Sequence, residues 1–476
     1  MLSRWILALA LLAPAVAAAE ERTGSATQTA VVEMAPQPHA ATASVLFFNR
    51  CRGGCTIKKS GLNDARTHSS QIPNGEATEY VMSEFGGSET DWQRFMTCIR
   101  EVYSPFAVTV VDEVPAPGVA YNENIVAGTD REIGVNAGGI APITGDCSPY
   151  SYVLSFTFAN VLNPANTELL CAVAAQESGH SFGLDHSFAF VDGQSACRDP
   201  MSYRGDCGGQ RFFRNESARC GEFNERPCRC GLLQNSHIKL AAVLGAGTPL
   251  TAPPAVTVSQ PAEGATVANG QVVLVTAGAQ RGVKSVELFL NGYLWTTTGG
   301  AAFGPRGQPE TTYPVVFPAN VPDGVIDIDV VVKDDIEATT RVPTIRVTKG
   351  APCTTADACA AGQRCDGEGR CLWDPPAGEF GDACTFEQFC KSGTCSGTAD
   401  EHICTQPCQV AGTGTCPESY ECLENGPGVG ICWPETLDPG CCSANRNVAT
   451  HATLASLVFG AGFLRRRRRR RQATAA

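Results

Sequence analysis

A short stretch near the middle of the chain spaces acidic, imidazole and amide side chains at intervals suited to a metal ion. Gln176 and His180 are four residues apart in an alanine-rich segment, residues 167–182, that contains no proline. A helix there would place both side chains on one face, with Glu177 beside them. Gly183 permits a left-handed turn, after which the chain can carry His186 back toward the same place. These groups could hold a divalent cation and take a proton from an activated water.

The eleven residues from Gln176 to His186 resemble the zinc motif of the metzincin metallopeptidases, His-Glu-x-x-His-x-x-Gly-x-x-His, at every defined position except the first. The later segment Asp199-Pro200-Met201-Ser202-Tyr203 is similar to the family's Met-turn. The resemblance implies Zn²⁺ as cofactor and the following site: zinc ligands Gln176, His180 and His186, general base Glu177, apolar floor Met201, and Tyr203 as a residue that stabilises the oxyanion or occupies a metal position at rest.

Gln176 departs from the family pattern, which has histidine at that position. An amide oxygen can coordinate zinc, but it is a weaker donor than an imidazole nitrogen, so we expect zinc affinity to suffer more than Lewis acidity. Retention of Glu177 favours an active enzyme, because a purely structural zinc site needs no general base. We therefore predict a secreted, cell-surface zinc endopeptidase acting on a protein or peptide substrate. The alternative is a weak or inactive metzincin-fold protein that binds or adheres, and a purely structural stalk leaves the motif spacing unexplained.

Composition and the N-terminus indicate export. Arg4 precedes a short apolar run and the small residues 17–19, a pattern typical of a signal peptide at 1–19. With an export signal, 24 cysteines indicate disulfides. A net charge of −12 argues against a nucleic-acid-binding protein.

The elements that must position the site lie in a predicted α+β domain, residues 44–247, after a disordered lead-in at 20–43. Apolar residues on one face predict a helix over 91–102, and an alanine-rich composition without proline predicts a helix over 167–182. Strands are expected at 44–48, 106–111 and 151–158, the last of them half-buried and at a sheet edge.

Cysteines in this domain suggest several local disulfides. Cys147 and Cys171 flank the last strand before the site helix and could pin it, and Cys197 and Cys207 bracket the Met-turn. Three further cysteines, Cys220, Cys228 and Cys230, predict a short disulfide-linked segment after it. Cys51 and Cys55 fit a local disulfide or two separate bridges, while a latency switch, in which a thiolate caps the zinc, is the less favoured alternative.

Two further domains follow. Residues 255–348 show short alternating strands at 256–258, 272–275, 286–290, 325–332 and 344–347, typical of a β-sandwich of immunoglobulin size. This segment resembles the bacterial Ig-like domains that follow secreted enzymes, and a spacer role is favoured. Residues 353–432 hold twelve cysteines and few large apolar residues, which predicts a small module with six disulfides.

The C-terminus, residues 438–476, combines Cys441-Cys442, an apolar run at 452–464 and seven arginines at 465–471. A basic block directly after an apolar helix keeps that end cytoplasmic. The arrangement resembles the MYXO-CTERM sorting signal of myxobacteria. That resemblance implies passage across the inner membrane, attachment at the cell surface or outer membrane, and cleavage near Cys441-Cys442, with anchored and released forms both compatible.

Overall fold

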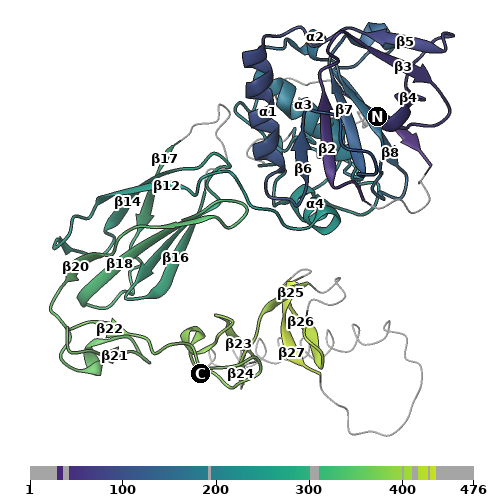
Figure 1. Cartoon of the computed structure of the whole chain (residues 1–476). Helices are drawn as coiled ribbons and strands as arrows, with labels where there is room; N and C mark the ends of the chain where they lie inside the picture. The colour runs from purple at the N-terminus through teal and green to yellow at the C-terminus, as the bar shows by residue number, and fades with distance from the viewer. Residues whose placement is uncertain are drawn as a thin grey trace, which may run out of the picture. The chain divides into compact units, whose positions relative to one another are not determined.

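The computed structural model describes residues 29–35, 42–190, 195–300, 310–398, 401–409, 416–426 and 429–435. The chain divides into two compact units, Met1–Trp373 and Asp374–Ala476 (Figure 1). It is multidomain and strand-rich, with few helices in the described part. The predicted signal peptide and the C-terminal sorting signal lie outside the described residues.

The first part of the larger unit contains a six-stranded sheet. Its order is β1-β8-β9-β7-β2-β6. The strands span Ala30–Met34 (β1), Gly139–Thr144 (β8), Leu154–Thr157 (β9), Tyr121–Val126 (β7), Val45–Asn49 (β2) and Thr109–Val111 (β6). β8 runs antiparallel to β9, whereas every other neighbouring pair is parallel.

Two helices, α1 (Glu89–Tyr103) and α3 (Thr167–His180), pack on each other beside this sheet (Figure 1). Ser88 begins α1 through a capping box with Asp91, and the apolar face that predicted this helix is buried. α3 buries every side chain from Leu170 to His180, as expected for a helix at the centre of a domain. The Cys98–Cys171 disulfide joins the two helices and fixes the element that carries the candidate site.

Two expectations about the sheet are wrong. β9 lies in the interior of the sheet and is buried on both faces, not half-buried at an edge. Its alternate residues Ser155 and Thr157 are polar but buried, and the Ser155 hydroxyl accepts a hydrogen bond from Asn124 at 2.9 Å. The predicted lead-in at 20–43 is also not wholly irregular, because residues 30–34 form β1 on the outer side of β8.

Smaller elements complete this part of the unit. They are β3 (Cys55–Lys59), β4 (Ser69–Ser70) and β5 (Glu79–Met82) in one sheet; β10 (Ser217–Ala218) paired with β11 (Gln234–Asn235); helices α2 (Ala159–Leu162) and α4 (Ser236–Leu244); and the 3₁₀ turns η1 (Ala65–Thr67), η2 (Asp130–Ile133) and η3 (Ser195–Arg198).

The disulfides of this domain agree in part with those predicted from the sequence. Cys51 pairs with Cys55, so neither sulfur is a thiolate and the latency-switch alternative is wrong. Cys197–Cys207 brackets the Met-turn as predicted. Cys147 and Cys171 do not pin the strand between them, because Cys147 forms a disulfide with Cys230 and Cys171 forms one with Cys98 of α1. Cys220–Cys228 closes the remaining loop.

The second part of the larger unit is a two-sheet sandwich. One sheet holds β12 (Ala255–Gln260), β14 (Val272–Gly278) and β17 (Thr311–Val316). The other holds β13 (Thr266–Val267), β20 (Ile345–Lys349), β18 (Gly324–Lys333), β15 (Ser285–Leu290) and β16 (Tyr293–Gly299), with β19 (Thr339–Arg341) beside β18. All five predicted strands are confirmed, and Asn291-Gly292 turns β15 into β16 with both φ angles positive.

The twelve cysteines of residues 353–432 form six disulfides, as their even number predicts, but they do not form one module. Three segments each hold two interleaved bridges: Cys353–Cys365 with Cys359–Cys371, Cys384–Cys395 with Cys390–Cys404, and Cys408–Cys422 with Cys416–Cys432. The first segment belongs to the larger unit and the other two to the smaller one. Short strands and turns accompany them: η4 (Ala356–Ala358), β21 (Arg364–Cys365), β22 (Cys371–Leu372), η5 (Glu387–Phe389), β23 (Cys395–Gly397), β24 (His402–Cys404), β25 (Pro407–Gln409), β26 (Tyr420–Gly426) and β27 (Val429–Pro434).

Candidate metal centre

The C-terminal end of α3 carries three of the predicted site residues. Gln176, Glu177 and His180 lie in its last two turns and are 2%, 0% and 0% exposed. Gly183 follows with a φ of 79°, and a Cβ at this position would lie 2.1 Å from the carbonyl oxygen of Cys147. Only glycine therefore fits this turn, which returns the chain so that His186 faces His180.

The two histidines meet through their Nε2 atoms, which are 3.0 Å apart. The Nδ1 of His180 lies 2.7 Å from the carbonyl oxygen of Leu184, and the Nδ1 of His186 lies 2.9 Å from a carboxylate oxygen of Glu222. Both partners accept hydrogen bonds, so each Nδ1 carries the hydrogen and a neutral ring leaves a lone pair on Nε2. Two facing lone pairs repel each other unless a proton or a cation lies against them, so this geometry fits a metal ion.

The side chains around the two histidines include polar atoms without a protein partner. Both carboxylate oxygens of Glu177 and the amide nitrogen of Gln176 are buried with no hydrogen-bond partner. Leaving such groups unpaired costs about 1–3 kcal/mol each, and more for a charged group. Burial raises the pKa of Glu177 well above its usual value, and it lowers the pKa of His180 well below. A neutral imidazole and an unpaired carboxyl suit a bound cation and a polar reactant.

Met201 packs against this end of the helix. It is fully buried, and a Cβ on Gly179 would lie 2.9 Å from its sulfur. Asp199 shapes the turn by accepting a hydrogen bond from the Met201 amide at 2.9 Å. Tyr203 follows, with its ring centroid 4.5 Å from that of His186 and its hydroxyl donating to the carbonyl oxygen of Thr29.

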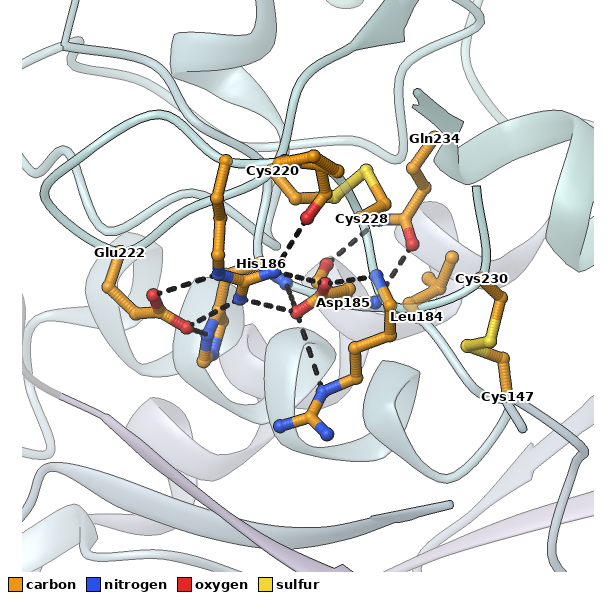
Figure 2. Close-up of polar contacts among 12 residues, drawn as sticks. Cys147, Leu184, Asp185, His186, Cys220, Glu222, Cys228, Cys230 and Gln234 are labelled. Carbon is orange, nitrogen blue, oxygen red and sulfur yellow. Dashed lines mark hydrogen bonds and ion pairs between the residues drawn. A yellow bond between two sulfur atoms is a disulfide. The ribbon is translucent and has the colours of Figure 1, made fainter. Parts of the chain in front are cut away.

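A loop after the Met-turn supplies residues that the sequence did not reveal (Figure 2). Glu222 accepts from His186, and Arg226 bridges Glu222 at 2.8 Å and Asp185 at 2.6 Å. The hydrogen bond from His186 holds the pKa of Glu222 well below its usual range, against the opposing effect of burial. The Cys220–Cys228 disulfide closes this loop. Three cysteines indicated a stapled segment here, but no sequence spacing related Glu222 to His186.

Among the described residues, the other groups of candidate metal ligands do not compete with this site. Three clusters of cysteines lie close enough together to hold an ion, but all their sulfurs are in disulfides. Asp185, His186 and Glu222 also lie within reach of one another. Asp185 is already paired with Arg226 and accepts from the Arg229 amide at 2.9 Å, so it supports the loop.

The predicted site residues therefore come together as one cluster. His180 and His186 converge, and Gln176 and Glu177 lie one turn before His180 in α3. Met201 lies against Gly179, and the Tyr203 ring lies against His186. Within the described residues, no helix is both long enough and apolar enough to cross a lipid bilayer.

Comparison with known proteins identifies only the sandwich. No curated protein matches the chain. Among solved structures, the fibronectin(III)-like modules of Clostridium thermocellum CbhA are 17% identical, cover 21% of this chain and 48% of that chain, and have a TM-score of 0.16. Dimeric latent PorU from Porphyromonas gingivalis is 14% identical over 21% and 11%, with a TM-score of 0.18. A Listeria innocua β-glucosidase in complex with isofagomine is 13% identical over 66% and 47%, with a TM-score of 0.18.

The chain thus spans about half or less of each of these proteins, and similarity at such TM-scores says nothing about the metal centre. The family model for a bacterial Ig domain matches residues 254–309, which include the first strands of the sandwich. The chain therefore contains a bacterial Ig domain and, after it, a disulfide-rich C-terminal region.

Proposed function

We propose that residues 44–247 form an α+β domain of metzincin type and act as a zinc-dependent endopeptidase. One observation carries the proposal: the Nε2 atoms of His180 and His186 face each other at 3.0 Å, and the buried Glu177 carboxyl has no protein partner. Such a cluster is costly to bury unless it serves a bound ion and a reactant.

The protein residues have separate roles in this proposal. His180, His186 and Gln176 would hold zinc, which supplies Lewis acidity toward water and the peptide carbonyl. Glu177, whose carboxyl oxygens have no protein partner, accepts a proton from the attacking water and delivers it to the leaving amine. The Tyr203 hydroxyl donates to the developing oxyanion once it is free of Thr29.

Glu222 completes the arrangement from the loop. A carboxylate that accepts from a ligating histidine fixes its tautomer and orientation and makes it a stronger donor. The 2.9 Å contact with His186 gives Glu222 this position, and Arg226 holds the carboxylate in place. This support offsets part of the weakness that an amide ligand at Gln176 introduces.

Export to the cell surface accompanies this function in our proposal. The eleven disulfides in the described part of the chain fit an oxidising compartment. The segments at 1–19 and 438–476 would direct secretion and surface attachment. The Ig domain and the disulfide-rich region then act as a spacer between membrane and enzyme.

A second candidate is a surface protein that binds peptides without cutting them. The amide at Gln176 favours this second candidate, because weak zinc binding would leave the site without the ion that hydrolysis requires. Casein hydrolysis by the full chain, with and without added zinc, distinguishes the two. The endopeptidase proposal expects cleavage that a chelator abolishes and zinc restores. Zinc-loaded, folded protein that leaves casein intact over a long incubation would favour the binding protein.

A further inference from the structure

One end of the sandwich carries a buried pair of opposite charges that contacts the preceding domain within the same compact unit. Arg281 lies in the turn between β14 and β15, and Asp335 lies just after β18. The two residues are 1% and 3% exposed. The Nε and Nη2 atoms of Arg281 donate to the two carboxylate oxygens of Asp335 at 2.8 and 3.0 Å. The sandwich therefore presents a planar charged pair, already assembled from its own residues, to the domain that precedes it.

Residues 213–215 of the preceding domain bind this pair. The Nη2 atom of Arg281 also donates to the carbonyl oxygen of Phe213 at 2.9 Å, and Asp335 accepts from the Asn215 amide at 3.0 Å. The Arg214 side chain lies 3.3 Å from the Asp335 carboxylate and donates to the carbonyl oxygen of Arg281. Buried charges are tolerated only when they are paired and hydrogen-bonded, so these groups require residues 213–215 to stay in one position.

Backbone hydrogen bonds connect the same segment to the turn that carries Met201, residues 199–203. The Arg214 amide donates to one carboxylate oxygen of Asp199 at 2.9 Å, and the Met201 amide donates to the other oxygen at 2.9 Å. The Phe212 amide donates to the carbonyl oxygen of Arg198 at 3.1 Å, just before the turn begins. The position of the Met201 turn therefore depends on the position of residues 212–214.

The Phe213 ring extends this contact to α3. A Cβ on Gly179 would lie 3.3 Å from the Cε1 atom of Phe213 and 2.9 Å from the sulfur of Met201. Gly179 immediately precedes His180, a candidate zinc ligand. The residue whose carbonyl oxygen is held by Arg281 thus packs against the helical turn that carries His180.

We infer that Arg281 and Asp335 of the sandwich are positioning residues for the candidate metal centre. The inference rests on the proposed function and concerns the same site. The charged pair acts through residues 213–215, which hold the Met201 turn and the last turn of α3 in register with each other. A close-packed interior transmits such a constraint, because it has little free volume in which a shift could be absorbed. The Ig domain is then part of the site's support in addition to being a spacer.

Arg281→Met tests this contact in the full chain from the side of the sandwich. Methionine keeps an unbranched apolar stem but cannot donate to Phe213 or Asp335. Arg281→Lys is the milder variant, because an ammonium can pair with Asp335 but lacks the planar fork that also reaches Phe213. Val347→Ala is the matched control. Val347 is fully buried in the same sandwich and lies opposite Ile326 in the first half of β18, whereas Asp335 follows the end of that strand.

The first measurement, hydrogen exchange, depends on neither metal nor catalysis. We expect the Met201 and Arg214 amides to exchange about threefold or more faster in Arg281→Met than in wild type, because exchange follows the ease of local opening. Arg281→Lys should show a smaller change in the same direction, and Val347→Ala none. If Arg281→Met does not fold, the comparison of Arg281→Lys with Val347→Ala decides. Wild-type exchange in every folded Arg281 variant would overturn the inference, as would equal acceleration in Val347→Ala, since the effect would then follow stability alone.

Metal binding then separates this inference from the proposed function. In competition with a chromophoric chelator, Arg281→Met should bind zinc about 2–30-fold more weakly than wild type, the range expected for coupling through packed residues. Co²⁺ bound in place of zinc should show a changed absorption spectrum in Arg281→Met and an unchanged one in Val347→Ala. Wild-type zinc affinity and a wild-type Co²⁺ spectrum in Arg281→Met would overturn the positioning role and leave the metal centre intact. Weaker zinc binding in Arg281→Met, together with wild-type protein that binds zinc but leaves casein intact, would support the positioning role and refute the endopeptidase.

Discussion

Two buried polar clusters in the larger unit differ in how their charges are satisfied. Around the end of α3, the Glu177 carboxyl and the Gln176 amide nitrogen have no protein partner, and two histidine Nε2 atoms face each other. In the second cluster, Arg281 donates to both oxygens of Asp335 at 2.8 and 3.0 Å, and Arg214 lies 3.3 Å from the same carboxylate. Burial alone would raise the pKa of Asp335, but the charges of Arg214 and Arg281 outweigh it and hold the pKa below its usual value.

The difference indicates which cluster needs something from outside the chain. Buried charges are tolerated when they are paired and hydrogen-bonded. The Asp335 carboxylate meets that condition with protein groups, although the Nη1 atom of Arg281 has no hydrogen-bond partner. The α3 cluster does not, so its stability and its function should both depend on a ligand. Each of the following predictions acts on one side of this contrast.

The largest expected effect is on turnover at the α3 cluster. Glu177→Gln keeps the shape of the side chain but removes the group that accepts the proton, so kcat should fall by about 10²–10⁴-fold. The effect should appear in the full chain, with zinc content unchanged. Glu168→Gln, in the exposed first turn of the same helix, serves as the control. Full activity in Glu177→Gln would remove Glu177 from the mechanism.

The Asp335 cluster should respond in stability and in its dependence on pH. Asp335→Asn leaves two arginines buried without their counter-charge and should lower the free energy of unfolding by about 3–5 kcal/mol. Because the folded-state pKa of Asp335 is depressed, its contribution is present above the unfolded pKa of about 4 and is lost as the pH falls through the folded value. Urea unfolding at neutral and acidic pH should therefore show wild type losing more stability on acidification than Asp335→Asn.

A control for that experiment comes from an ion pair of the sandwich in which one partner is open to solvent. Asp329→Asn breaks an ion pair at 3.3 Å with Arg341, whose side chain is 55% exposed, and should cost about 0–1 kcal/mol. Similar costs for the two variants would mean that burial does not distinguish the clusters.

The next effect concerns zinc affinity. Glu222→Gln should weaken zinc binding by about 10–100-fold, because the amide no longer stabilises the orientation and basicity of His186 as a carboxylate does. Competition with a chromophoric chelator measures this change. Glu225→Gln, whose carboxylate pairs with Arg219 at the surface, should bind zinc as wild type does. Identical affinities in Glu222→Gln and wild type would reduce Glu222 to a structural residue of the loop.

The smallest change is expected at the variant ligand. Gln176→His replaces a weak amide donor with an imidazole, so zinc should bind about tenfold more tightly, a gain of roughly 1.4 kcal/mol. Activity should be equal or greater. Lower zinc occupancy in Gln176→His would contradict the assignment of position 176 as a ligand.

The local parts of this structure were predictable from the sequence because they depend on short spacings. The helix around Trp92 follows from apolar periodicity, and the helix around Ala174 follows from an alanine-rich run without proline. The turn at Gly183 and the Asn291-Gly292 hairpin follow from positive φ angles that glycine and asparagine tolerate.

The parts that could not be predicted depend on contacts between distant segments. Glu222 lies 36 residues from His186, and Thr29 lies 174 residues from Tyr203. The burial of β9 on both faces could not be predicted, because Ser155, though polar, is buried and hydrogen-bonded to Asn124 in the neighbouring strand. Cysteine positions predicted six bridges after residue 353 but not that Cys147 would reach Cys230.

Zinc content tests the central claim most directly. The full chain, purified and dialysed against trace zinc, should retain one equivalent of zinc by elemental mass spectrometry. A His180→Ala, His186→Ala chain that remains folded by circular dichroism should retain none. Folded wild-type protein that retains no more zinc than this double variant would contradict the metal centre and, with it, the endopeptidase.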